Sequence, residues 1–171
     1  MEAVLEKIDP FAPPPPPPEH PKFDTTKPVE IVSKFTMADM PNWGPWLLWK
    51  MKQRWPRLSE RTYVSWLQNY IMSNQAFLRK TKHTLLFALI ENEPLDPQPI
   101  VREILLYVTD MEFRDESAEL YKELATWATS VRAKGICGIG IYSDLLPIQV
   151  HAMLKKAGLK GKNNVEITIA L

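Results

Sequence analysis

Four carboxylates and one arginine crowd into the segment that joins an apolar run at residues 104–108 to an amphipathic run beginning near residue 116. Many α/β proteins bind phosphate at such a strand–loop–helix joint, because the first turn of the helix offers unpaired N–H groups and the positive end of its dipole. Phosphate binding also favours glycines and cations, and this joint has no glycine and one cation, Arg114. The position therefore predicts an anion site, while the residue types oppose one. The acids are Asp110, Glu112, Asp115 and Glu116.

The acids also have a purely structural interpretation. Asp115 is placed to cap the helix, and Glu116 and Glu119 fall in its first turn. Carboxylates there oppose the helix dipole favourably, by about 0.3–1 kcal/mol each. We favour this hypothesis, in which the protein's own acids satisfy the helix end.

Hydrophobic periodicity predicts the elements that position the joint. The order is a strand, two helices, about three strands, then helix, strand, helix and strand, which indicates antiparallel hairpins followed by a right-handed parallel crossover. Gly135 and Gly158 are placed to end the last two helices. A turn at 42–45 is expected to precede the first helix. The expected strands are 29–35, 76–82, 84–90, 100–108, 136–142 and 165–170, and the expected helices are 45–55, 59–73, 116–133 and 145–157.

This order, with three local motifs, resembles the GCN5-related N-acetyltransferase (GNAT) family. The motifs are the strand, joint and helix at 104–133, the strand at 136–142, and the helix ending LKKAGL at 154–159. The resemblance implies an α/β (α+β) fold over residues 29–171, an acyl-CoA N-acyltransferase-like mixed sheet flanked by helices. It also implies where acetyl-CoA would bind, if it binds. Those residues are Arg114, Asp115, Glu116, Ser117 and Ala118.

The joint departs from the family's pattern. In the family, the pyrophosphate of acetyl-CoA lies on a loop of the form Arg/Gln-x-x-Gly-x-Gly/Ala. Aligned on Arg114, the glycine positions become Ser117 and Glu119, and Glu119 places a bulky anion near the expected phosphates. The resemblance therefore implies weakened or lost cofactor binding.

The family's tyrosine general acid is also missing. Its position is Leu154, and a leucine cannot reprotonate a departing thiolate. Tyr142 and His151 lie nearby in the sequence and are the candidate substitutes if the chain is catalytic. Neither has a neighbouring motif that supports the role.

Residues 1–28 form a separate proline-rich arm with nine of the sixteen prolines. The unbroken run at 13–18 predicts an extended polyproline II rod. An apolar set at helical spacing precedes it and predicts a plug that enters a groove on a partner protein. A disordered tail is the alternative. The apolar set is Val4, Leu5, Ile8 and Phe11.

Tryptophans and basic residues alternate between residues 43 and 66. Trp43, Trp46 and Trp49 recur at every third position, which places them along one helix face. We favour a core stripe with solvated Lys and Arg, but a protein-binding surface and a single-stranded nucleic-acid surface stay open.

The totals limit the remaining function classes. With 21 Lys+Arg against 20 Asp+Glu, charge does not point to nucleic acid or an anionic membrane as an obligatory partner. The single cysteine fits a reducing compartment, and isolated histidines predict no metal site. A cytoplasmic protein, or one packaged in a virion assembled there, is expected.

Two functional hypotheses follow. The leading one is a non-catalytic GNAT-like structural protein without cofactor, tethered by its arm to a partner in a larger assembly such as a phage particle. The alternative is an acetyl-CoA-dependent N-acetyltransferase with an atypical pyrophosphate loop.

Overall fold

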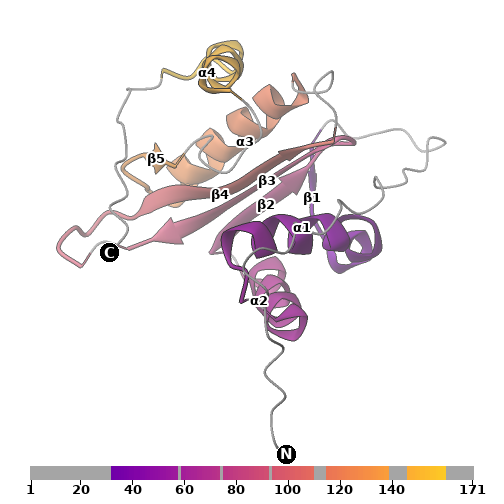
Figure 1. Ribbon diagram of the computed structural model, residues 1–171. Coiled ribbons are helices and arrows are strands. Elements are labelled where there is room, and N and C mark those ends of the chain that lie inside the picture. The colour runs from indigo at the N-terminus through magenta and orange to yellow at the C-terminus, as the bar shows by residue number, and fades with distance from the viewer. Residues whose placement is uncertain are drawn as a thin grey trace, which may run out of the picture.

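The computed structural model describes residues 32–57, 59–73, 75–92, 94–109, 115–138 and 146–160. Within them, a five-stranded sheet lies between helices (Figure 1). The strands are β1 (Ser33–Lys34), β2 (Ala76–Lys80), β3 (Thr84–Glu91), β4 (Ile100–Val108) and β5 (Ile136–Cys137). The helices are η1 (Met37–Asp39), α1 (Met40–Arg54), α2 (Glu60–Met72), α3 (Glu116–Ser130) and α4 (Pro147–Lys156).

The strands lie in the order β1-β2-β3-β4-β5. The first four pair antiparallel, and β5 pairs parallel with β4 after the crossover through α3. Helices α1 and α2 cover one face of the sheet, α3 covers the other, and α4 lies beyond α3 (Figure 1). The predicted mixed α/β sheet flanked by helices is therefore confirmed. The expected strand 165–170 and the arm at 1–28 lie outside the described residues.

The aromatic stripe of α1 belongs to the core beneath the sheet. Trp43 and Trp46 are 2% and 5% exposed. Their rings meet the ring of Tyr107 on β4 at centroid distances of 6.1 and 5.0 Å. Trp49 is partly buried and packs against the same cluster. The structure thus places Trp43 and Trp46 in the core rather than on a partner-binding surface.

Helix α1 begins before the predicted position. The expected turn at 42–45 is wrong, because α1 runs from Met40 through Pro45 to Arg54. Pro41 occupies the first turn, where the missing N–H has no helical partner to lose. Pro45 then forfeits one hydrogen bond near this end, and packing of the tryptophans outweighs the loss.

A bulge in β4 changes which face its side chains reach. The register between β3 and β4 skips Ile104. Val101 and Glu103 before the bulge, and Leu106 after it, therefore all lie on the α3 face. The side chains that β4 directs toward α3 are therefore not evenly spaced along the strand.

A buried acid lies at this bulge. The Glu103 carboxylate is 1% exposed and accepts a hydrogen bond of 2.8 Å from the Tyr121 hydroxyl on α3. Burial, followed by the charge of Glu103 and the hydrogen bond to it, raises the pKa of Tyr121 well above its ordinary value. Sequence reasoning missed this pair, although a glutamate inside an apolar strand is a visible signal.

The C-terminus of α3 is closed by a residue that is not glycine. Arg132 adopts φ 59°, and the Ala133 N–H donates to the Ala128 carbonyl at 2.9 Å. This is the Schellman arrangement with arginine in the left-handed position. The predicted cap at Gly135 is wrong, because the Gly135 carbonyl instead accepts from the Val101 N–H at 3.0 Å.

The end of α4 follows the prediction. Gly158 has φ 75°, and the Leu159 N–H donates to the Leu154 carbonyl at 2.9 Å. No helix in the described part of the chain is long and apolar enough to cross a membrane.

The two helix ends give a matched test. Arg132→Gly should raise the free energy of unfolding by about 0.5–1 kcal/mol, because glycine adopts positive φ without a Cβ penalty. Gly158→Ala should lower it by about 1 kcal/mol for the converse reason. Urea denaturation measures both, and a destabilised Arg132→Gly would contradict the assignment of the cap.

The Glu103–Tyr121 pair predicts alkaline sensitivity. Above about pH 10, tyrosines of the unfolded chain ionise, whereas the raised pKa keeps Tyr121 protonated in the folded protein. The unfolded state then binds fewer protons, so stability falls as the pH rises. Tyr121→Phe should reduce the loss between pH 10 and 11 by roughly 1 kcal/mol.

At pH 8 the same variant should cost about 1–3 kcal/mol, since the buried carboxylate loses a donor. Tyr70→Phe, at a partly exposed position, is the control. Urea denaturation from pH 8 to 11 checks both effects. An unchanged alkaline slope in Tyr121→Phe would refute the pH argument.

Candidate functional site

Gly138, directly after β5, lies against Glu103 at the bulge of β4, and we call this contact the fork. Strand β5 pairs with β4 at Val101↔Ile136 and Arg102↔Cys137. Gly138 then takes φ 74°, and a Cβ there would lie 3.1 Å from the Glu103 carbonyl oxygen. This left-handed backbone favours glycine, and the described part of the ladder extends as far as Cys137. From Glu103 onward, no described residue pairs with β4 on this side.

Strand β4 leads to the joint, and α3 follows the joint. Residues 110–114, including Arg114, lie outside the described residues, and the chain is described again from Asp115. Asp115 is the residue before α3, but its side chain does not cap the helix. Its carboxylate instead accepts a hydrogen bond of 2.7 Å from Lys156 Nζ on α4.

The predicted cap at Asp115 is therefore wrong, and the backbone explains why. Asp115 has φ −66° and ψ −24°, which is helical. A capping side chain needs an extended backbone to reach the N–H groups of the first turn. The N-terminus of α3 thus has no side-chain cap within the described residues.

The carboxylate of Glu116 is held by the turn between β2 and β3. The Thr81 hydroxyl donates to Glu116 Oε2, and the His83 N–H donates to the same atom at 3.2 Å. His83 Nδ1 lies 2.8 Å from Glu116 Oε1. Thr84 extends this network through the Thr81 hydroxyl, at 2.6 Å. Tertiary contacts therefore commit this acid to a hairpin turn.

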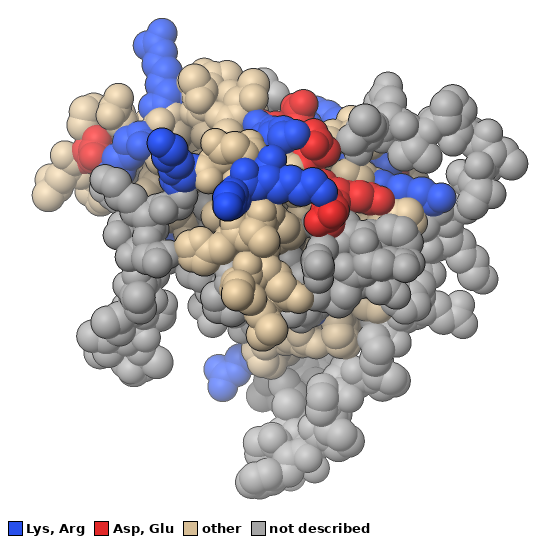
Figure 2. Space-filling view, turned by 90° about the horizontal axis from the view of Figure 1, so that it is seen from above, with Lys and Arg blue, Asp and Glu red and all other residues tan. Residues whose placement is uncertain are grey.

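Glu119, the second acid of the first turn, is also engaged. Glu119 Oε1 accepts from Lys122 Nζ at 2.6 Å on the surface of α3. The Glu119–Lys122 and Asp115–Lys156 ion pairs place acidic and basic side chains next to each other on the surface of α3 and α4. Figure 2 shows both kinds of side chain on this face. The three acids that the structure describes at the start of α3, Asp115, Glu116 and Glu119, are thus each bonded to another group, and Asp110 and Glu112 lie outside the described residues.

Ser117 holds a donor without an acceptor. The residue is 0% exposed, and its hydroxyl has no hydrogen-bond partner among the described residues. Ala118 beside it is also buried, and its N–H donates to the Asp115 carbonyl at 3.2 Å. A buried hydroxyl in the first turn of a helix can donate to an anion that reaches the helix end.

The structure brings together only part of the predicted site. Residues 115–118 form the start of α3, whereas Arg114 and Tyr142 lie outside the described residues. His151 is exposed on α4, and Leu154 is buried in the core on the α3 face. The arm residues lie outside the described residues too. They are Val4, Leu5, Ile8 and Phe11.

Sequence reasoning missed Glu103 and Gly138, the two residues at the fork. Gly138 lies in a short glycine pair within an apolar run, which alone is a weak signal. No group of three or more His, Cys, Asp or Glu among the described residues is placed to hold a metal ion.

No protein-family model matches this sequence, and no curated protein sequence matches it. Several solved structures share its fold. The aminoglycoside antibiotic 6'-N-acetyltransferase AAC(6')-IG from Acinetobacter haemolyticus aligns over 82% of this chain and 97% of its own, with 16% identity and a TM-score of 0.51. AAC(6')-Iy, solved with the bisubstrate analog CoA-S-monomethyl-acetylneamine, aligns over 85% and 99%, with 14% identity and a TM-score of 0.53.

A third similar structure is the ribosomal-protein-alanine N-acetyltransferase from Brucella melitensis biovar Abortus 2308. It aligns over 84% of this chain and 100% of its own, with 11% identity and a TM-score of 0.54. Identities this low show the fold alone. This chain has the fold of the GCN5-related N-acetyltransferases.

Proposed function

We propose that this chain is an acetyl-CoA-dependent N-acetyltransferase, the second of the two hypotheses that the sequence left open. The observation that carries the proposal is the start of α3, which follows β4 and has no side-chain cap, so that its dipole end and its first-turn N–H groups can receive an anion. The fold is one that acetyltransferases share, which supports the same function.

The residues present fit the anionic end of acetyl-CoA better than the sequence alone implies. Asp115, Glu116 and Glu119 are bonded to Lys156, to the β2–β3 turn and to Lys122. The start of α3 keeps its positive dipole end and the unpartnered Ser117 hydroxyl. These groups, with Arg114 of the joint, would hold the phosphates.

Acetyl-CoA, when bound, supplies the acetyl group as a thioester. The backbone N–H and C=O groups of β4 beyond Arg102 would hydrogen-bond the amides of its pantetheine arm. Glu103 and Tyr121 act as positioning residues in this proposal, because their hydrogen bond fixes the strand at the bulge beside the fork. Tyr142 and His151 stay the candidates for the general acid.

A second function is favoured by one observation. Leu154, at the position of the family's tyrosine, is 6% exposed and packs in the core. A GNAT-fold protein without catalysis would need no acid there. In this case the arm at 1–28 would tether the chain to a protein partner in a larger assembly, such as a virion.

Calorimetry with acetyl-CoA and the full chain distinguishes the two functions. We expect saturable binding with a dissociation constant below about 1 mM, or about −4 kcal/mol. Ser117→Ala should weaken it about three- to tenfold by removing one hydrogen bond to the phosphates. Without ligand, the same variant should be at least as stable as the parent, because a buried unpaired hydroxyl is removed.

Ser130→Ala at the far end of α3 is the matched control. Its exposed hydroxyl donates to the Trp127 carbonyl at 2.7 Å, away from the first turn, so affinity should not change. If calorimetry detects no binding heat at millimolar acetyl-CoA, the acetyltransferase proposal is refuted and the non-catalytic tethered protein becomes the better hypothesis. Equal weakening in both serine variants would refute the role of Ser117.

A further inference from the structure

A hollow lies at the opposite edge of the sheet from the fork. Strand β1 pairs with β2 at Ser33↔Lys80 and Lys34↔Arg79, and the Phe35 N–H then donates to the Leu78 carbonyl at 3.1 Å. After Phe35 the chain turns into η1. The rest of the outer edge of β2, at Ala76, has no neighbouring strand among the described residues.

The backbone of Ala76 faces this open edge. In an antiparallel ladder, successive residues direct their N–H and C=O groups to opposite sides of the strand. The Ile90 N–H donates to the Gln75 carbonyl at 3.2 Å, so Gln75 faces β3. Ala76 therefore faces outward and offers one donor and one acceptor to an added strand.

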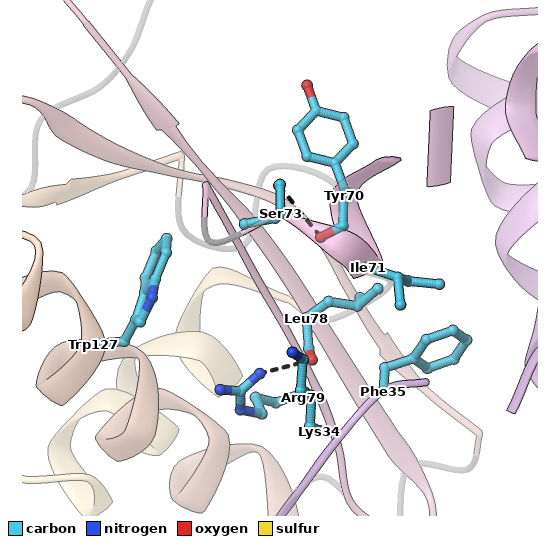
Figure 3. A pocket seen from close by; sticks show the side chains of 9 residues that line it. Lys34, Phe35, Tyr70, Ile71, Ser73, Leu78, Arg79 and Trp127 are labelled. Atoms are coloured by element: carbon cyan, nitrogen blue, oxygen red, sulfur yellow. Dashed lines mark hydrogen bonds between the residues drawn. The ribbon is translucent and has the colours of Figure 1, made fainter. Parts of the chain in front are cut away.

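The hollow beside this edge has a volume of about 50 Å³ and is lined by Lys34, Ser73, Arg79 and Trp127, among others (Figure 3). Its lining includes two cations and no acid. Sites for whole small molecules measure roughly 300–1,000 Å³. This hollow therefore suits a single terminal group.

Arg79 is the most informative residue of the lining. It is partly buried, and one guanidinium N–H donates to the Leu78 carbonyl at 3.2 Å. Its Cζ lies 5.2 Å from the centroid of the Phe77 ring, so the guanidinium folds back along β2 toward Ala76. No described carboxylate forms an ion pair with it, and the remaining donors can receive an anion.

The electrostatic surroundings agree with this geometry. Partial burial lowers the pKa of Arg79, and the charge of Glu123 on α3 opposes that shift. A half-buried guanidinium without a paired carboxylate is a cation that an incoming carboxylate would stabilise. Lys34 adds a second, exposed positive charge at the mouth of the hollow.

We propose that this edge pocket, defined by Lys34, Ser73, Ala76, Arg79 and Trp127, binds the C-terminal residue of an extended peptide. The last peptide group of the ligand pairs with the outward N–H and C=O of Ala76. The carboxylate at its C-terminus contacts Arg79 and Lys34. The open strand edge selects a peptide over a free carboxylate, and the cations select its terminus over an internal segment. Strands β3 and β4 lie between this pocket and the fork, so the two sites do not overlap.

The test is a ¹⁵N NMR titration of the full chain with N-acetyl-Val-Thr-Val carrying a free carboxylate, alongside the same peptide as its C-terminal amide and acetate alone. The free acid should shift the Ala76 amide and the Trp127 indole signals saturably. The C-terminal amide and acetate should each bind at least about tenfold more weakly, because each lacks one half of the recognition.

Two variants test carboxylate recognition and backbone pairing separately. Arg79→Gln should weaken the free acid about tenfold, and Ala76→Pro should do the same by removing the outward donor. Proline is tolerated here because its nitrogen faces the open edge rather than β3. If Arg79→Gln does not fold, the exposed Lys34→Gln replaces it, with an expected loss of about threefold.

Arg61→Gln, an exposed arginine at the other end of α2 from the pocket, is the control and should leave the affinity unchanged. Equal binding of acid and amide would overturn the proposal. Acetate as tight as the peptide, or an unaffected Ala76→Pro, would overturn it as well, by assigning the pocket to a small free carboxylate.

Discussion

The architecture depends on β4, which is packed on both faces and must also end at the joint. Tyr107 of β4 packs against α1, whereas Val101 and Leu106 lie on the α3 face. A regular strand cannot place Val101 and Leu106 on one face, because side chains alternate with period two. The bulge at Ile104 solves this, and it leaves Glu103 buried among apolar residues. The hydrogen bond from Tyr121 makes that burial tolerable, since a buried carboxylate without a donor is costly.

Strand β4 contributes both to the core and to the position of the candidate site. Gly138 approaches Glu103 so closely that a Cβ would lie 3.1 Å from the Glu103 carbonyl oxygen, which favours glycine at this position. The bulge of one strand thus lies beside a left-handed residue that follows the next strand. Beyond it, β4 leads toward the N-terminus of α3, where backbone dipoles favour an anion. The two sheet edges differ accordingly: the β4 side faces a helix end, and the β2 side faces Arg79 and an open ladder position.

The acids at the start of α3 show how local inference fails. From the sequence, Asp115, Glu116 and Glu119 read as caps or as repellents of phosphate. Both interpretations treat the joint as a segment that interacts with itself. In the folded chain, Asp115 bonds Lys156, 41 residues away, and Glu116 bonds the turn at Thr81 and His83. A cap depends on backbone dihedrals that long-range packing sets, so residue type alone does not predict it.

The sequence by itself determined the order of elements from β1 to α4, the full extent of β4 and of α2 to within a residue, and the glycine stop of α4. Each follows from hydrophobic period or from a residue with a special backbone, which are properties of neighbouring positions. Only the tertiary structure decided that Pro45 lies inside a helix, that Arg132 replaces Gly135 as the cap, and that Trp43 and Trp46 are core. It alone revealed the Glu103–Tyr121 pair, the fork and the edge pocket. These depend on contacts between residues far apart in the chain, whose energies outweigh local preference and leave no periodic trace in the sequence.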